Sequence, residues 1–364
     1  MRVAIIGCGL IGRKRALGLD ESSALVACCD TNAEAAQKFA AEFSCRVFTD
    51  YQSLLRHAKS DIVVVAVVNK FARNIALGAL ESGNHVLVEK PLGRNAVEAA
   101  EIVDGLQAAQ NGRHLVLKVG YNHRFHPAVW KARQICDGGG IGKILTIRAR
   151  YGHGGRPGME KEWRASKDLC GGGELLDQGV HVIDLIRWFG GEITEVYGRV
   201  ETKFWPMEVE DNASAILKTG SDVTASFHVS WTNWKNIFSF EIFGTEGYLR
   251  IEGLGGSYGP ETLEFGKRRK EGGVPDIERD EFPVEDVSWK LEWQDFLSAI
   301  KDKRRPVGDG IDGLRANEVI EAMYRSSAEQ KVVKIGTGEG PATFALPHHP
   351  GSEHEVGTRN GKRE

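Results

Sequence analysis

Long hydrophobic segments are missing from this sequence. No stretch approaches the roughly 20 apolar residues that a membrane-spanning helix needs. At the start, Met1 and Arg2 lead directly into Val3–Ile6, without the longer apolar stretch and small-residue cleavage site of a signal peptide. We therefore expect a cytoplasmic protein with no membrane partner.

Metal-binding patterns are scarce as well. The six cysteines form no C-x-x-C pair, and no H-E-x-x-H segment occurs. His348, His349 and His354 lie near the end of the chain and form no metal-ligand pattern with cysteine or acidic partners. We predict buried free thiols in a reducing compartment and no catalytic metal.

The sequence has no large excess of either charge. Its 47 Lys and Arg residues stand against 50 Asp and Glu, which gives a net charge of −3 and no reason to expect a nucleic-acid partner. A hydrophobic content of 41% with 27% charged residues is typical of globular proteins. Since 364 residues exceed one ordinary core, we expect two domains.

Short apolar runs alternate with helical patterns over residues 1–121. The expected strands are Val3–Ile6, Leu25–Cys29, Ile62–Val68, His85–Val88 and Leu115–Val119, and the expected helices include Ala33–Phe43, Lys70–Ser82 and Asn95–Gln110. Such alternation implies parallel strands joined by right-handed crossovers. We therefore predict an α/β fold that opens with a Rossmann domain, a doubly wound parallel sheet, over 1–121.

The pattern changes to consecutive strands over residues 122–336. The expected strands are Lys143–Tyr151, Ile193–Phe204, Ala213–Lys218, Val223–Trp231, Phe238–Phe243 and Tyr248–Glu252. They predict a second α+β domain with a mainly antiparallel sheet. A helix near 310–330 is a candidate to pack back on the first domain. Residues 337–364 are polar and predict a mobile tail.

A dinucleotide-binding signature follows the first strand. Glycines 7, 9 and 12 form G-x-G-x-x-G at the start of a helix, where backbone N–H groups can bind a pyrophosphate. Asp30 ends the second strand, 18 positions after Gly12, as expected for a carboxylate that binds the adenosine ribose. Asp30 favours NAD over NADP, although the nearby Arg13, Lys14 and Arg15 leave NADP possible. The predicted cofactor-binding residues are Gly7, Gly9, Leu10, Ile11, Gly12, Asp30, Asn69, Glu89 and Lys90.

Two further motifs carry the expected chemistry. Glu89-Lys90-Pro91 ends the strand His85–Val88, and ligands of open α/β sheets bind beyond such strand ends, so Lys90 should lie near the nicotinamide. Asp177 and His181 lie four residues apart behind three glycines, a spacing that places both on one helix face.

Together these motifs resemble the Gfo/Idh/MocA oxidoreductase family, the group of glucose–fructose oxidoreductase and inositol dehydrogenase. The resemblance covers residues 7 to 184 and includes Gly120-Tyr121-Asn122-His123-Arg124-Phe125 and Gly171–Asp184. It implies that Lys90, Asp177 and His181 are the catalytic residues. It also implies a carbohydrate or polyol substrate, and a homodimer or homotetramer assembled through the second domain's open sheet.

For this chemistry we assign His181 as the base that takes the proton of a secondary alcohol. Lys90 would stabilise alkoxide character and lower the pKa of His181. Asp177 would orient the imidazole or hold a neighbouring substrate hydroxyl. Lysine as the base remains an alternative.

The predicted substrate-binding residues are Lys90, Tyr121, Arg124, Arg164, Asp177 and His181. Basic residues outnumber acidic ones between 148 and 168, which indicates either a solvated face or a substrate with an anionic group. Two other functions stay open beside an NAD(P)-dependent dehydrogenase. One is an NAD-assisted glycosidase or epimerase of the same family, and the other is a catalytically silent dinucleotide-sensing regulator.

Overall fold

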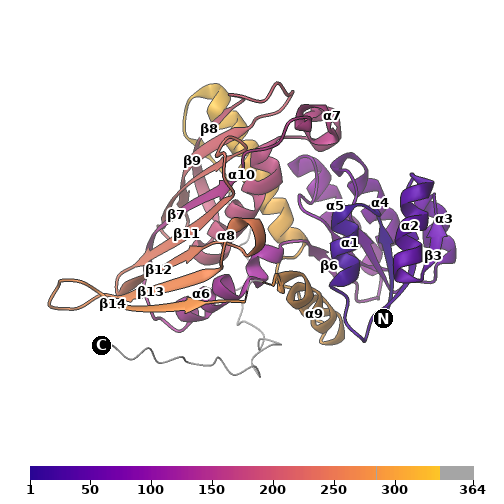
Figure 1. Cartoon of the computed structure of the whole chain (residues 1–364), viewed down its shortest axis with the longest axis horizontal. Coiled ribbons are helices and arrows are strands. Elements are labelled where there is room, and N and C mark those ends of the chain that lie inside the picture. The colour runs from indigo at the N-terminus through magenta and orange to yellow at the C-terminus, as the bar shows by residue number, and fades with distance from the viewer. Residues whose placement is uncertain (284, 337–364) are drawn as a thin grey trace.

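A computed structural model describes residues 1–283 and 285–336 of the chain. Two sheets organise them, one in each half of the sequence (Figure 1). The predicted tail, 337–364, lies outside the described residues.

The N-terminal sheet has six parallel strands in the order β3-β2-β1-β4-β5-β6. Its strands are β1 (Arg2–Ile6), β2 (Ala24–Cys29), β3 (Arg46–Phe48), β4 (Ile62–Val65), β5 (His85–Val88) and β6 (Leu117–Val119). Its helices are α1 (Leu10–Leu17), α2 (Ala33–Phe43), α3 (Tyr51–His57), α4 (Asn69–Glu81) and α5 (Ala96–Gln110). The reversal of strand order between β1 and β4 creates the switch point at which doubly wound sheets bind ligands.

Local sequence explains these boundaries. All four residues of β4 are buried, as expected for an apolar strand covered on both faces. The Asn32 side chain caps α2 by accepting hydrogen bonds from two backbone N–H groups, and the Asn95 side chain caps α5 by accepting one from the backbone N–H of Glu98. The sequence-based interpretation missed α3 and β3, because an edge strand of three residues carries no periodic pattern.

The second sheet has nine strands in the order β14-β13-β12-β11-β7-β10-β9-β8-β15. Its strands are β7 (Ile144–Gly152), β8 (Ile193–Glu201), β9 (Asn212–Thr219), β10 (Thr224–Ser230), β11 (Ile237–Gly244), β12 (Gly247–Glu252), β13 (Thr262–Lys267), β14 (Asp276–Glu281) and β15 (Val333–Lys334). Among the described residues, the β7–β10 pairing is the only parallel one in this sheet, so the predicted mainly antiparallel sheet is confirmed. The charged edge strand β14 was not predicted, because its sequence lacks apolar alternation.

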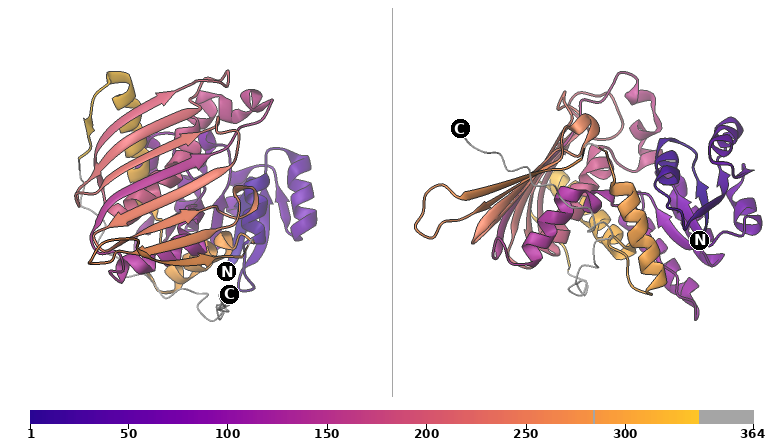
Figure 2. Two further views of the ribbon diagram at one scale, coloured as in Figure 1. Left: turned by 60° about the vertical axis from the view of Figure 1, so that its left-hand side comes forward. Right: turned by 60° about the horizontal axis from the view of Figure 1, so that its bottom comes forward.

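Helices cover one face of the second sheet and leave the other open (Figure 2). The helices of this half are α6 (Pro127–Asp137), α7 (Lys167–Cys170), α8 (Val180–Gly190), α9 (Ser288–Lys301) and α10 (Gly310–Glu329). α10 packs against both β8 and α5, and therefore lies between the two halves of the molecule. No described helix is long and apolar enough to cross a membrane.

Candidate active site

The glycine loop between β1 and α1 leaves space in which a ligand could bind. A Cβ atom on Gly7 would lie 2.0 Å from the Ala66 carbonyl oxygen, and one on Gly12 would lie 1.9 Å from the Gly7 carbonyl oxygen. Those two glycines are therefore required by the loop itself. A Cβ on Gly9 meets no protein atom within 4 Å, and Leu10 is 72% exposed. Open space at Gly9, where α1 begins, fits a bound pyrophosphate.

Asp30 lies beside this loop. Its carboxylate accepts hydrogen bonds from the backbone N–H of Cys8 (2.9 Å) and of Asn32 (2.9 Å). These bonds hold the carboxylate next to the glycine loop, where the predicted contact with a ribose would be made.

Arg13, Lys14 and Arg15, the basic residues that left NADP possible, each interact with another side chain of the protein. Arg13 pairs with Glu42, and the Lys14 ammonium lies 5.1 Å from the centre of the Trp289 ring. Arg15 is buried and donates to Glu89 at 2.5 Å. Each side chain therefore has a partner other than a cofactor phosphate.

Lys90 and Asp177 meet across the domain boundary. Lys90 follows β5, at the carboxyl end of the parallel sheet, and its Nζ donates to Asp177 Oδ1 (2.6 Å) and to the Asp177 backbone oxygen (2.7 Å). Burial alone would raise the pKa of Asp177, but the charges of Lys90 and Arg164 outweigh burial and lower it to about 2. Asp177 is therefore ionised at any physiological pH.

Asp177 does not orient His181, which corrects one of the two roles considered for it. Residues Leu175–Gly179 form a π-helical turn, and α8 begins only at Val180. The i→i+5 hydrogen bonds of a π turn change the offset between side chains four residues apart. Within the described part of the chain, His181 Nδ1 is buried without a hydrogen-bond partner.

His181 lies in a dry, positively charged setting. Its side chain is 4% exposed, and burial lowers its pKa well below the usual 6.5, with Lys90 as the next cause. The predicted effect of Lys90 on this pKa therefore has the expected sign. A neutral imidazole at pH 7 is the form that can accept a proton.

Two predicted substrate-binding residues are not open to a substrate. Tyr121 is fully buried, with its ring edge-on to His181 at 6.1 Å. The guanidinium of Arg124 is buried between Asp184 (2.6 Å) and Asp312 (3.1 Å). The sequence could not reveal this pairing, because Asp312 is 188 positions away in the chain.

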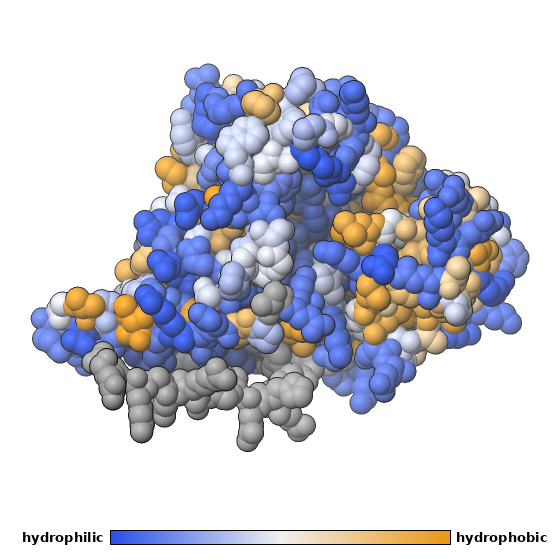
Figure 3. Space-filling view, in the orientation of Figure 1, coloured by the Kyte–Doolittle hydropathy of each residue, from blue (hydrophilic) through white to orange (hydrophobic). Residues whose placement is uncertain are grey.

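Arg164 does lie at the site, with Nε 3.5 Å from Asp177 Oδ2. Asn69 donates to the Cys170 backbone oxygen at 2.8 Å, and thereby ties the start of α4 to the second domain. Two other basic residues of this stretch have acidic partners: Arg148 pairs with Glu241 on the sheet, and Arg156 pairs with Glu162. The charge of His153 acts on Asp177 and therefore lies near the site. Figure 3 shows a hydrophilic hollow between the two domains.

Several polar residues around the site were missed. Glu174 is fully buried, and neither carboxyl oxygen has a hydrogen-bond partner among the residues described. Burial, followed by the charge of Asp177, raises its pKa well above 4.5. Gln178 donates to the Tyr258 hydroxyl at 2.9 Å. Gln178 and Glu174 lie close to Asp177 in sequence, and this proximity could have identified them as residues of the site. Nothing in the sequence pointed to Tyr258.

Metal binding finds no support in the described ranges 1–283 and 285–336, where no group of three or more His, Cys, Asp or Glu side chains could hold an ion. The histidines at 348, 349 and 354 lie outside those ranges, so the absence of a catalytic metal stays a prediction.

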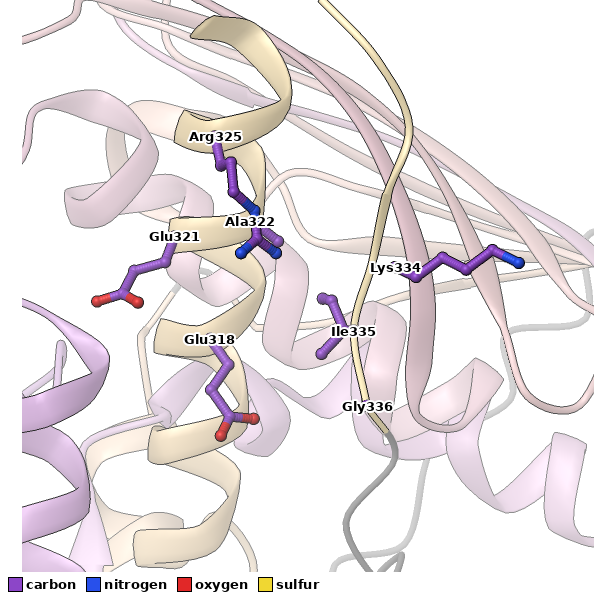
Figure 4. A pocket seen from close by; sticks show the side chains of 7 residues that line it. All are labelled: Glu318, Glu321, Ala322, Arg325, Lys334, Ile335 and Gly336. Carbon is purple, nitrogen blue, oxygen red and sulfur yellow. The ribbon is translucent and has the colours of Figure 1, made fainter. Parts of the chain in front are cut away.

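A groove of 450 Å³ lies away from these residues, between α10 and β15 (Figure 4). It is lined by Glu318, Glu321, Ala322, Arg325, Lys334, Ile335 and Gly336. None of the predicted catalytic, cofactor-binding or substrate-binding residues contributes to it.

Comparison with known proteins places the chain in a family. Residues 1–120 match the profile described as "Oxidoreductase family, NAD-binding Rossmann fold", and residues 129–250 match "GFO/IDH/MocA C-terminal domain". The chain belongs to the GFO/IDH/MocA oxidoreductase family. The predicted family, fold class and NAD-binding domain are thereby confirmed.

Other members of the GFO/IDH/MocA family resemble most of the chain. Levoglucosan dehydrogenase of Pseudarthrobacter phenanthrenivorans is 26% identical over 85% of this chain and 80% of its own length. Inositol 2-dehydrogenase 2 of Saccharopolyspora erythraea is 28% identical over 95% and 98%. A solved levoglucosan dehydrogenase in complex with NADH and levoglucosan shares the fold, with a TM-score of 0.84, 23% identity and coverage of 93% and 100%.

Proposed function

We propose that this oxidoreductase removes a hydride from a secondary hydroxyl-bearing carbon of a cyclic sugar or polyol, or reduces the corresponding ketone. The observation that carries the proposal is the contact of Lys90 with Asp177 next to a buried, neutral His181, at the carboxyl end of β5. NAD, when bound, supplies the nicotinamide C4 that accepts the hydride.

In this proposal each residue has one task. His181 takes the hydroxyl proton on Nε2, since Nδ1 is buried on the other side of the ring. Lys90 presents a positive charge where alkoxide character develops. Asp177 fixes the direction of the Lys90 ammonium through two hydrogen bonds, which is a different task from orienting the imidazole.

The substrate class is supported by the names of the relatives. They include levoglucosan dehydrogenase and inositol 2-dehydrogenase 2, and also a D-glucoside 3-dehydrogenase and a UDP-N-acetylglucosamine 3-dehydrogenase. An anionic substituent is a further option. Lys90 and Arg164 both flank the single charge of Asp177, so with neutral histidines this group of three has a net charge of +1.

The test is a panel of levoglucosan, myo-inositol, methyl D-glucoside, D-glucuronate and UDP-N-acetylglucosamine with NAD or NADP, followed at 340 nm. We expect net NADH formation with at least one compound, and a loss of kcat of roughly two to four orders of magnitude in His181→Ala with NADH affinity kept. An unchanged kcat in His181→Ala would refute the assigned base. Turnover without net NADH would indicate the glycosidase or epimerase alternative instead.

Assembly through the open sheet face is part of the same proposal. Tyr197 and Ile216 are cross-strand neighbours there, 42% and 57% exposed, on a face that no helix covers (Figure 2). A homodimer or homotetramer should appear by light scattering, and Ile216→Arg should dissociate it. The six free cysteines support the expected reducing, cytoplasmic location, which cell fractionation would test.

A further inference from the structure

His181 lacks the contact that usually orients a catalytic imidazole. Such a ring is commonly held by a hydrogen bond from its second nitrogen to a carboxylate or carbonyl group. Here Nδ1 has no partner in the part of the chain that the structure describes, and the Asp177 carboxylate is engaged by Lys90 and Arg164. Another contact must fix the plane of the ring.

That contact is the ring of His123. The two imidazoles are stacked, with centroids 3.7 Å apart and planes inclined by 21°. Tyr121 and Tyr151 approach His181 edge-on at the longer distances of 6.1 and 6.5 Å. His123 is therefore the ring that lies flat against the proposed base.

Hydrogen bonds fix both nitrogens of His123. Nε2 lies 3.0 Å from the Tyr151 hydroxyl, and Nδ1 lies 3.2 Å from Asn122 Oδ1. Asn122 in turn donates its amide N–H to Ser288 Oγ at 2.9 Å, and Ser288 donates to Asp286 at 2.5 Å.

The donor and acceptor order of these hydrogen bonds determines the tautomer of His123. The Ser288 hydroxyl has one proton, which it donates to Asp286, so it accepts from the Asn122 amide. The Asn122 oxygen then faces His123, whose Nδ1 must carry the proton. Nε2 is left as an acceptor for the Tyr151 hydroxyl, so His123 cannot gain a second proton without losing that bond.

We propose that His123 is the positioning residue for His181: locked as a neutral imidazole by Asn122 and Tyr151, it holds the His181 ring by stacking in place of a bond to Nδ1. The proposal rests on the proposed role of His181 as the base. When His181 takes up a proton, the resulting cation lies on a neutral π face, which attracts it, whereas a second imidazolium would repel it.

The surroundings of His123 favour the neutral form. Burial lowers its pKa well below 6.5, with further lowering from nearby groups. Those groups are His181, His126, Lys90 and Lys14. None of them is an acid that would favour an imidazolium at this position.

Nitrogen-15 NMR of histidine-labelled enzyme with bound NADH tests, without a substrate, whether His123 is held as the neutral Nδ1–H tautomer. We expect His123, assigned by its loss in His123→Phe, to show the neutral Nδ1–H pattern from pH 5.5 to 8.5. A titrating His123 or the Nε2–H tautomer would overturn the proposal. The pH series itself is recorded on the wild-type protein, and His123→Phe serves only to assign the signal.

Steady-state kinetics test the stacking of His123 on His181. The substrate is levoglucosan or, if the enzyme does not turn over levoglucosan, the compound of the panel that it does turn over. His123→Leu removes the flat ring and should lower kcat at least tenfold and raise the primary isotope effect with substrate deuterated at its carbinol carbons. His123→Phe keeps a flat ring and should stay within threefold of wild type. KM and NADH affinity should change by less than twofold in both.

Controls separate this inference from the proposed function. His57→Leu alters an exposed histidine in α3 of the first domain, outside the site, and should leave all constants unchanged. If His181→Ala abolishes turnover while His123→Leu retains it, only the positioning role is wrong. If His181→Ala itself retains turnover, the proposed base is wrong. Equal losses in His123→Phe and His123→Leu at unchanged Tm would exclude stacking as the cause.

Discussion

Lys90 Nζ donates to both the side chain and the backbone of Asp177, at 2.6 and 2.7 Å, and thereby joins the nucleotide-binding sheet to the helix that carries His181. Both bonds cross the domain boundary, so the position of the ammonium depends on how the two domains pack. A change at either residue should therefore affect the chemistry more than cofactor binding.

Lys90→Met should lower kcat by about two to three orders of magnitude, because the charge that stabilises a developing alkoxide is lost. The remaining activity should also shift in pH. Lys90 helps to lower the pKa of His181, so its removal raises that pKa and moves the acid limb of the kcat profile to higher pH. As a control, Lys70→Met removes an equal charge from the ion pair that Lys70 forms with Asp168 between the domains. It should leave the acid limb of the kcat profile unchanged.

Asp30→Asn should raise the ratio of kcat/KM for NADP to that for NAD by tenfold or more, because a carboxylate at this position binds ribose hydroxyls and repels a 2′-phosphate. Asp50→Asn is the matched control. Asp50 also follows a strand of the same sheet and caps α3, and removing its charge should leave the ratio unchanged. Equal ratios in wild type and Asp30→Asn would contradict the assignment of Asp30.

Arg124→Met should act on stability and not on substrate binding. It leaves Asp184 and Asp312 without their shared partner inside the protein, which costs about 3 to 5 kcal/mol of unfolding free energy. Urea unfolding measures the loss, and Arg148→Met on the sheet surface serves as control. A stable Arg124→Met variant with a raised KM would restore the original prediction of a substrate contact.

Glu174→Gln should preserve activity, since burial raises the pKa of Glu174 well above 4.5 and thereby favours the neutral carboxyl that a glutamine mimics. The folded protein holds this proton above the pKa of 4.5 at which the unfolded chain releases it. Wild-type stability therefore decreases as pH rises above 4.5, whereas the glutamine has no proton to lose. The variant should gain stability relative to wild type between pH 5 and 8, and the exposed Glu271→Gln should show no such trend.

The sequence by itself determined the nucleotide-binding fold. Gly7, Gly9, Gly12 and Asp30 act within one strand-helix-strand unit, where spacing along the chain sets spacing in space. Most long strands and helices could be predicted from apolar periodicity, because that pattern also depends only on residues close together in the chain. Strands β3, β13 and β14 were not predicted. β3 has only three residues, β13 has only two apolar side chains, Leu263 and Phe265, and β14 is charged along its length, so none shows a sustained period.

Only the tertiary structure decided how the site is assembled. Arg124 was expected to face the cleft, but Asp312 from α10 pairs with it inside the protein. Asp177 was considered as the group that orients His181, four residues away, yet Asp177 lies in a π turn and its carboxylate binds the ammonium of Lys90. The ring against which His181 packs belongs to His123, from a different segment of the chain. Contacts between residues remote in sequence depend on how the domains pack, and no local pattern encodes them.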